Sequence, residues 1–404
     1  MEQTKQTPKL YNETEQKEEQ QRILKEIEEE QKSIDKIKEN LKDIPEQDRE
    51  LTATKYYQNY KKVSLVNAIN EFVKTANYNR QFKPYITTGF NQLDELLNGG
   101  IYNGRLYIVG AESGLGKTTF LLQIAENIAR NNKPVIFYSL ELSKFDLIAK
   151  CLSRATFDLD EKKAINTTTI MNGSYTDEQS EHLAKAIDKY NNDAVLENLI
   201  IDEGRQGTIT ADYIRDNIKM VKAIKGKTPV IFIDYLQFIA LMQDGTGKDY
   251  RIIVDNLLKD LESITREFNT PIVIISSINR ASNNKSISNN SFKESGTIEF
   301  TADMTIGIEY IYTPSTKDYD DIYEKKAKER EYNEQENIRH GHNYKSDNLL
   351  LKIMKARYGD SCKKVFLKYI GCYAKFIETI SPEEKAKQEE SKRNDNEIIK
   401  PKNF

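Results

Sequence analysis

The sequence is poor in cysteine and has no long apolar run. Its 404 residues include only three cysteines, Cys151, Cys362 and Cys372, and no two of them form a Cys-X-X-Cys pair. This usage does not support a disulfide framework or a cysteine-based zinc site, and we expect buried, reduced thiols. No segment approaches the roughly 18 consecutive apolar residues of a membrane helix. Because the amino terminus is also polar, we predict a cytoplasmic protein without a signal peptide or membrane span.

The chain also lacks an excess of either charge. Lys and Arg together number 60, Asp and Glu number 63, and the formal net charge is −3. A domain that binds nucleic acid through its overall charge would be strongly basic. Any contact with nucleic acid must therefore depend on a local patch or on the channel of a ring.

The first 62 residues are predicted to form a charged, coiled-coil-like helical segment. Residues 12–44 carry apolar side chains at two heptad positions, Glu30 interrupts this seam, and Pro45 ends it. A seam this short can pair two helices weakly or pack on the body of the protein. Residues 63–84 are predicted to contain a linker helix that ends before the domain boundary at Pro84. Its apolar face carries Leu65, Ile69, Phe72 and Val73.

Strands and helices alternate from residue 85 onward, which predicts an α/β domain over 85–380 with a mostly parallel central sheet covered on both faces. Apolar runs predict strands at 105–110, 134–139, 197–202, 229–234, 271–276, 303–311, 348–355, 363–369 and 373–377. Helices are predicted near 117–131, 143–155, 177–190, 209–224 and 251–268. The polar stretch 315–347 is predicted to be a surface insertion or partly disordered loop, and 381–404 a disordered charged tail.

A glycine-rich loop lies between the first of these strands and the first helix. Residues 110–119 read Gly-Ala-Glu-Ser-Gly-Leu-Gly-Lys-Thr-Thr, the P-loop pattern with Ala111 in place of its first glycine. Backbone N–H groups of such a loop cradle phosphates, the lysine adds a positive charge, and the first threonine offers a hydroxyl to Mg²⁺. We therefore predict an NTPase; the alternative is a tight surface turn. The predicted nucleotide-binding residues are Ser113, Gly114, Leu115, Gly116, Lys117, Thr118 and Thr119.

Two apolar strands are followed by acidic residues that suit nucleotide hydrolysis. Residues 229–234 end in Asp234, and the strand that starts at Pro134 leads to Glu141. The carboxyl ends of adjacent parallel strands line the ligand crevice of an open sheet. Hydrolysis needs a carboxylate on the metal side and a group that orients the attacking water. We assign Asp234, with Thr118, to the metal side and Glu141 to the water; Glu141 is alternatively a charge at the start of the next helix.

These motifs and their spacing resemble the RecA-like ATPase domain of DnaB-type replicative DNA helicases over about residues 85–378. The segment Ser139-Leu-Glu-Leu142 resembles the family's Ser-Leu-Glu-Met, whose glutamate is the catalytic base. The segment Ile233-Asp-Tyr-Leu-Gln237 matches the family's metal-binding strand, and alanine is common in the family at the first P-loop position. Ser277 stands where the family has a glutamine, so the relay from the γ-phosphate to the DNA loops is left open.

The resemblance also implies a DNA-contacting loop. Residues 292–303 resemble the family segment Arg-Glu-Ser-Gly-Xaa-Ile-Glu-Xaa-Xaa-Ala-Asp, which lines a central pore and touches single-stranded DNA. Charge and close backbone approach are what a protein needs to track phosphates without reading bases. The alternative is an ordinary surface turn. The positions implied to contact DNA are Lys293, Glu294 and Gly296.

A second segment of the resemblance implies a residue that acts on the neighbouring subunit. Lys355-Ala-Arg357, followed by Gly359, resembles Lys-Gln-Arg-Asn-Gly, which supplies a lysine and an arginine finger to the next subunit's nucleotide. Arginine suits this role because its planar, permanently charged fork can meet two phosphate oxygens. The alternative is an exposed basic strand edge.

The resemblance as a whole implies a hexameric helicase that uses ATP and Mg²⁺, translocates on single-stranded DNA with 5′–3′ polarity and unwinds duplex DNA in replication. A primase or a helicase loader would be a partner. The family's globular amino-terminal domain is not recognisable in residues 1–62, although the helix of 63–84 could pack on an adjacent subunit. A RadA- or KaiC-like RecA-fold ATPase that does not unwind DNA, and a scaffold that binds nucleotide only to assemble, are alternatives.

Overall fold

The computed structural model describes residues 13–204, 209–237, 250–278, 287–288, 291–292, 295–311, 322–339, 341–342, 344–357, 364–381 and 384. The chain divides into two compact units, and the boundary falls between Lys83 and Pro84. No helix in the described part of the chain combines the length and the apolarity that a membrane crossing requires.

The first unit contains three helices, α1 (Glu13–Asn40), α2 (Glu46–Val63) and α3 (Leu65–Gln81). Helices α1 and α2 pack together and bury Ile34 and Ala53, while Ile27 of the predicted heptad seam stays exposed. Glu30, the charge that interrupts the seam, accepts hydrogen bonds from Gln58 (2.6 Å) and Lys61 (3.2 Å) of α2. Part of the seam therefore packs within the chain, in a hairpin whose second helix the sequence did not predict as a separate element.

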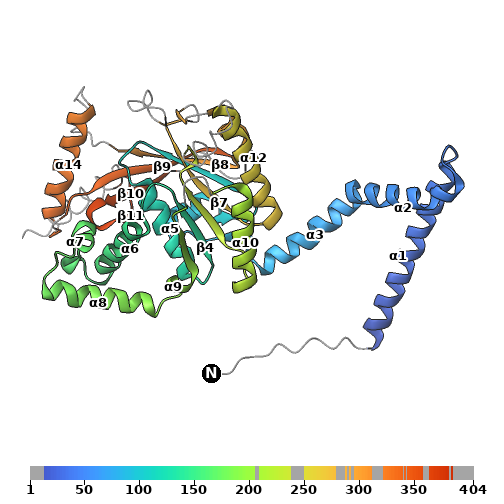
Figure 1. The fold of residues 1–404 in the computed structure, drawn as a ribbon, viewed down its shortest axis with the longest axis horizontal. Coiled ribbons are helices and arrows are strands. Elements are labelled where there is room, and N and C mark those ends of the chain that lie inside the picture. The colour runs from blue at the N-terminus through green and yellow to red at the C-terminus, as the bar shows by residue number, and fades with distance from the viewer. Residues whose placement is uncertain are drawn as a thin grey trace, which may run out of the picture. The chain divides into compact units, whose positions relative to one another are not determined.

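The second unit is built on a mixed sheet with the strand order β11-β10-β9-β8-β3-β7-β6-β4-β5 among the described residues (Figure 1). The strands from β8 to β5 in this order are parallel, and β9, β10 and β11 extend the sheet antiparallel. The predicted α/β fold with a mostly parallel central sheet is confirmed. The strands are β3 (Leu106–Ala111), β4 (Val135–Ser139), β5 (Leu199–Asp202), β6 (Val230–Asp234), β7 (Ile272–Ser277), β8 (Met304–Tyr310), β9 (Asp347–Ala356), β10 (Lys364–Ile370) and β11 (Lys375–Thr379).

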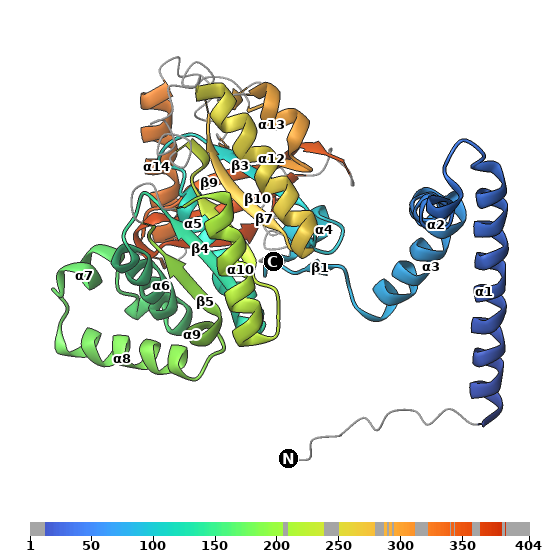
Figure 2. The same cartoon turned by 45° about the vertical axis from the view of Figure 1, so that its right-hand side comes forward.

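Helices cover both faces of the sheet because successive residues of its inner strands point to opposite faces. In β3, Tyr107 and Val109 join one apolar core, whereas Leu106 and Ile108 join the other. Helix α5 (Lys117–Arg130) packs in the first core, and α10 (Ala211–Lys225) and α12 (Tyr250–Phe268) lie side by side over the second (Figure 2). Further helices are α4 (Asn91–Leu96), α6 (Lys144–Leu159), α7 (Thr167–Asn172), α8 (Asp177–Asn191), α9 (Val195–Asn198) and α13 (Ser295–Thr301), and a small sheet pairs β1 (Tyr85–Ile86) with β2 (Ile101–Tyr102).

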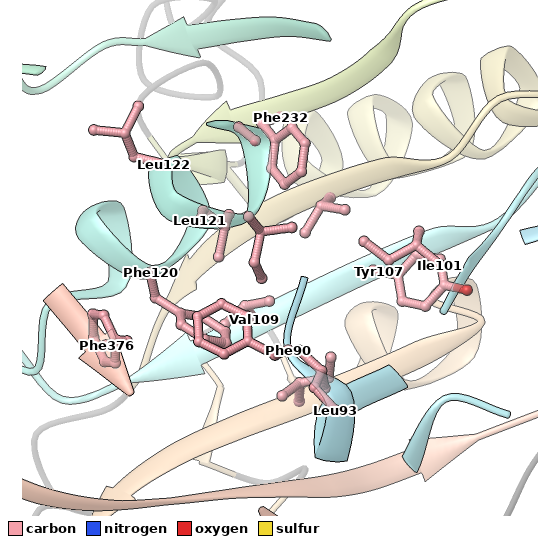
Figure 3. Packing of buried hydrophobic residues seen from close by; sticks show 14 of the residues in the cluster. Phe90, Leu93, Ile101, Tyr107, Val109, Phe120, Leu121, Leu122, Phe232 and Phe376 are labelled. Carbon is pink, nitrogen blue, oxygen red and sulfur yellow. The ribbon is translucent and has the colours of Figure 1, made fainter. Parts of the chain in front are cut away.

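The carboxyl-terminal hairpin of β10 and β11 is fixed to α5, the helix that follows the P-loop. Phe120 of α5 meets Phe376 of β11 edge to face, with ring centroids 5.1 Å apart (Figure 3). The Gln123 side chain exchanges two hydrogen bonds with the Phe376 backbone, at 3.0 and 2.8 Å. Strands from the far end of the sequence therefore support the helix that begins the candidate site.

Two local expectations are wrong. Within 315–347, predicted as a surface insertion or partly disordered loop, the loop alternative is wrong over α14 (Ile322–Arg339), which is a helix. Between residues 327 and 339 its buried side chains are polar, so this part gives no apolar period; Asn337, for example, donates to the Tyr344 carbonyl and to Ser346, both at 3.0 Å. Cys151 is buried as expected, but Cys372 is exposed. Most of 381–404, predicted to be a disordered tail, lies outside the described residues.

Candidate nucleotide-binding site

The P-loop joins the end of β3 to the start of α5. Gly114 and Gly116 have φ values of +85° and +75°, a left-handed conformation that side-chain-bearing residues rarely adopt. Leu115 between them is buried and anchors the loop to the core. Gly116 is the N-cap of α5 and has no side chain to cap the helix, so the first N–H groups of α5 are left for an anion. The backbone thus has the geometry of a phosphate cradle.

Lys117 lies over this loop. Its ammonium donates hydrogen bonds to the carbonyls of Ala111 and Glu112, each at 2.9 Å. Burial lowers the pKa of Lys117, while the neighbouring carboxylates Asp234 and Glu141 act in the opposite direction. A half-buried cation held by neutral carbonyls can exchange them for phosphate oxygens, which bind it more strongly.

Thr118 and Asp234 form the metal side of the candidate site. The Thr118 hydroxyl donates to Asp234 Oδ2 at 2.5 Å, and Asp234 ends the buried strand β6. Burial raises the pKa of Asp234 to about 6; the charge of Glu141 adds to this, and the Thr118 hydrogen bond and Lys117 oppose it. Burial disfavours the charged form of this carboxylate, and a cation bound beside it would stabilise that form. The hydroxyl and the carboxylate are oxygen ligands of the kind that Mg²⁺ prefers, so the residues present fit Mg²⁺ bound with a nucleotide.

Glu141 lies beside this pair because two strands end in register. Ser139 of β4 pairs with Asp234 of β6, and the next residue, Leu140, donates its N–H to the Asp234 carbonyl at 2.9 Å. Glu141 follows, with an exposed side chain whose charge acts on both Asp234 and Lys117. The start of α6 is capped instead by Ser143 and Asp146 in a capping box. The carboxylate of Glu141 is therefore not needed as the cap and faces the site.

Lys355 and Arg357 lie at the opposite edge of the sheet from their own P-loop. The Arg357 N–H donates to the Asp303 carbonyl (2.9 Å), and the Asp303 N–H donates to the Leu106 carbonyl (3.0 Å) at the start of β3. The P-loop begins only after Ala111, at the other end of that strand. At about 3.3 Å per residue, the two ends of β3 are roughly 16 Å apart.

Both basic side chains are held by the end of α13 and by nearby acids. Arg357 donates to the Phe300 carbonyl at 2.7 Å and pairs with Asp303 (3.3 Å) and Glu262 (3.6 Å). Lys355 donates to the carbonyls of Ala302, at 2.7 Å, and of Glu299. Helix carboxyl ends favour cations in this way. Burial lowers the pKa of Lys355, and the charge of Arg357 adds to this.

The residues that the resemblance implied for DNA contact are only partly described. Gly296 lies in α13 and is exposed, whereas Lys293 and Glu294 lie outside the described residues. Of the nucleotide set, Ser113 and Gly114 are exposed at the tip of the loop, and Thr119 is buried behind it.

Sequence reasoning missed one residue that supports the loop. Tyr369 of β10 lies against Gly116, where an added Cβ would come within 2.7 Å of the Tyr369 ring. The Tyr369 ring in turn stacks on Phe376, with centroids 4.4 Å apart. The glycine signalled a close approach, but nothing in the sequence indicated which distant side chain makes it.

Comparison with known proteins identifies the family. The model of the DnaB-like helicase C-terminal domain matches residues 85–378. The chain is 30% identical over 267 residues to a probable replicative DNA helicase of Trieres chinensis, covering 63% of this chain and 54% of that protein. It is 30% identical over 250 residues to the replicative DNA helicase DnaC of Bacillus subtilis, covering 61% and 49%. The chain thus spans about half the length of these curated relatives.

Solved structures agree on the fold. One solved ATPase domain superposes with a TM-score of 0.59 at 22% identity, covering 79% of this chain and 99% of that one. A DnaB-like replicative helicase, described with its interactions with primase, gives the same TM-score at 21% identity and covers 82% and 78%. With a P-loop, a buried Asp234 and an exposed Glu141 at the carboxyl edge of a RecA-like sheet, this chain belongs to the DnaB-like helicase C-terminal domain family.

Proposed function

We propose that the protein is an ATP-dependent, ring-forming DNA helicase that translocates on single-stranded DNA in the 5′–3′ direction and unwinds the duplex during replication in the cytoplasm. The observation that carries this proposal is the meeting of Lys117, Thr118, Asp234 and Glu141 at one edge of the sheet. Family membership and the names of the replicative relatives support it.

In this proposal the P-loop binds ATP. The N–H groups at the start of α5 and the Lys117 ammonium hold the β- and γ-phosphates, and the loop from Ser113 to Thr119 shapes the cradle. Thr118 and Asp234 hold Mg²⁺, which neutralises phosphate charge when it is bound. Glu141 orients the attacking water, because its carboxylate is exposed beside Asp234 and free of a capping role.

Hydrolysis is completed by a second subunit. Arg357 lies at the far end of β3 from its own P-loop, so we propose that it and Lys355 act on the nucleotide of a neighbour. A guanidinium there stabilises charge that develops on the transferred phosphoryl group. This requirement favours a closed ring, and we propose a homohexamer.

Single-stranded DNA is the proposed substrate, held in the ring by Lys293, Glu294 and Gly296. The first described residue of this segment, Phe292, is buried against Gly110 near the end of β3, which supports a DNA-contacting segment that starts close to the proposed ATP site. The related DnaB-like replicative helicase interacts with primase, and we propose a primase or a loader as a partner here. The exposed apolar residues of α3, among them Leu65 and Phe72, suit packing on an adjacent subunit.

Strand separation on a forked duplex tests the proposal. The parent protein should unwind the fork with ATP, and Glu141→Gln should bind ATP yet turn it over about 10²–10³-fold more slowly, as expected for losing one transition-state contact. Glu203→Gln is the matched control, since Glu203 also follows a strand end but accepts a hydrogen bond from the Lys144 N–H instead. Binding of single strands with ATP turnover but no strand separation would favour the RadA- or KaiC-like alternative.

A further inference from the structure

Gly110, the residue before the P-loop proper, is in close contact with a phenylalanine from another part of the chain. A Cβ added at Gly110 would lie 2.4 Å from Cε1 and 2.8 Å from Cζ of Phe292. The φ of Gly110 is not in the left-handed region, so its backbone does not require glycine. The ring of Phe292 requires glycine at this position, because it occupies the space that any side chain would fill.

Phe292 is the root of the proposed DNA-contacting segment. Its side chain is 0% exposed, and its backbone forms an antiparallel bridge with Ile278, directly after β7. The next residue in the sequence is Lys293. The ring is thus fixed on the P-loop strand, immediately before Lys293 in the sequence.

The end of β7 also connects to the strand of the metal-side carboxylate. Gln237, three residues after Asp234, is buried, and its side-chain amide donates to Ser276 Oγ at 2.9 Å. The Ser277 N–H donates back to Gln237 Oε1 at 3.1 Å. In the sheet register, Ser276 lies opposite Gly110. The ends of β3, β6 and β7 are therefore joined next to the contact between Gly110 and Phe292.

We propose that Phe292 is a positioning residue that couples the ATP site to the DNA-contacting segment through its contact with Gly110. This inference rests on the proposed function and names the route by which the two sites of that function communicate. A shift of the P-loop strand moves Gly110, and the packed ring cannot stay in place because protein interiors are close-packed. The backbone before Lys293 then moves with the ring.

This route does not pass through the side chain of Ser277. The short hydroxyl of Ser277 cannot span the distance that a glutamine spans, but its backbone N–H already binds Gln237. The coupling is carried by the volume of Phe292 and by backbone contacts of β7. It follows that the size of the two residues, rather than the side chain of Ser277, sets the strength of coupling.

A size swap tests the contact and the coupling together. Gly110→Ala adds a methyl group that clashes with the Phe292 ring. Phe292→Leu replaces the ring with a smaller side chain, and the double variant combines the two changes. Phe157→Leu is the matched control, because Phe157 is a buried phenylalanine of α6 that packs on Tyr344 and Tyr373, away from Gly110. Each protein is measured for thermal unfolding, for ATPase with and without single-stranded DNA, and for DNA affinity with and without a non-hydrolysable ATP analogue.

We expect Gly110→Ala and Phe292→Leu each to reduce the ratio of DNA-stimulated to DNA-free ATPase by about fivefold or more, the lower range of coupling between sites. The double variant should recover most of that ratio and of the unfolding temperature, because leucine leaves room for the new methyl group. Phe157→Leu should lower the unfolding temperature yet keep the ratio.

Three results overturn the inference and are distinct from failure of the proposed function. In the first, Phe292→Leu keeps the parental ratio and the nucleotide dependence of DNA affinity. In the second, the double variant is as impaired as the sum of the single variants. In the third, the double variant regains the parental unfolding temperature but not the ratio of DNA-stimulated to DNA-free ATPase, which would assign Phe292 a structural role only. If the parent protein itself shows no DNA-stimulated ATPase, the proposed function fails first, and the inference falls with it.

Discussion

Removing Arg154 from its ion pair with Glu126 should cost more stability than breaking any exposed pair among the described residues. Arg154 of α6 is 2% exposed and Glu126 of α5 is 4% exposed. Arg154 donates to Glu126 Oε2 from Nε (2.9 Å) and Nη2 (2.6 Å), and to the Ala374 carbonyl from Nη1 at 2.5 Å. One guanidinium therefore joins the P-loop helix, α6 and the carboxyl-terminal hairpin.

Arg154→Met removes the charge while keeping much of the side-chain volume. It leaves Glu126 buried, with Arg130 and Tyr190 as remaining partners, and leaves the Ala374 carbonyl without this donor. Removing one partner of a buried pair costs about 3–5 kcal/mol in unfolding free energy. The matched control is Arg130→Met, because Arg130 pairs with the same carboxylate but is 38% exposed. Because the Arg130 guanidinium is partly exposed and screened by water, its loss should cost less than the loss of Arg154.

Urea unfolding at neutral pH, followed by circular dichroism, measures the difference between the two variants. We expect the Arg154→Met midpoint to fall far below that of Arg130→Met. The double variant Arg154→Met/Glu126→Leu should regain part of the loss, because the buried carboxylate, which in Arg154→Met keeps only the partly exposed Arg130 as an ionic partner, is then removed. Equal, small effects of the two single variants would refute the reasoning.

The pH dependence of stability provides an independent check on the same pair. Burial alone would raise the pKa of Glu126, but the charges of Arg154 and Arg130 outweigh it and lower the pKa below its ordinary 4.5. The stabilisation is therefore fully present above about pH 4.5 and is lost as the pH falls through the depressed pKa of the folded state. In Arg154→Met this acid-side loss should be much smaller, as unfolding curves at several pH values would reveal.

Two further predictions concern the ATP and DNA sites. Because burial raises the pKa of Asp234 to about 6, Mg²⁺-dependent affinity for a fluorescent ATP analogue should fall as the pH drops through 6, and affinity that stays constant from about pH 7.5 to about pH 5.5 would remove Asp234 from the metal side. Lys293→Ala should weaken single-strand binding about equally for all sequences and flatten its salt dependence by roughly 0.7 in log–log slope, the value for one phosphate contact on single strands; an unchanged slope in titrations at several salt concentrations would contradict the assignment.

The sequence predicted the parts of the site that are coded locally. The P-loop, Asp234 and Glu141 each follow a short apolar run, and a buried parallel strand needs such a run. The sheet was predicted for the same reason, down to boundaries within about two residues at β3 and β6. Local motifs are therefore sufficient to predict that the phosphate loop and the two carboxylates lie at the carboxyl edge of the sheet.

What the sequence did not predict depends on contacts between distant residues or on polar packing. Nothing near Gly110 in the sequence indicates that the ring of Phe292 fills its missing side chain. Helix α14 was not predicted because the side chains it buries between residues 327 and 339, such as Asn333 and Asn337, are polar and give no apolar period. Arg357 was predicted from a resemblance, but its place on the carboxyl end of α13 is a property of the fold.

The central claim is that the ATP site of one subunit is completed by Arg357 of the next, and ATPase activity in mixed assemblies tests it most directly. Arg357→Ala protein keeps an intact P-loop, and Lys117→Ala protein keeps an intact Arg357. Each alone should be nearly inactive. When the two are mixed, some interfaces combine one intact half from each, and activity should reappear in proportion to those interfaces. Mixed assemblies that demonstrably form and yet hydrolyse no ATP would contradict the claim.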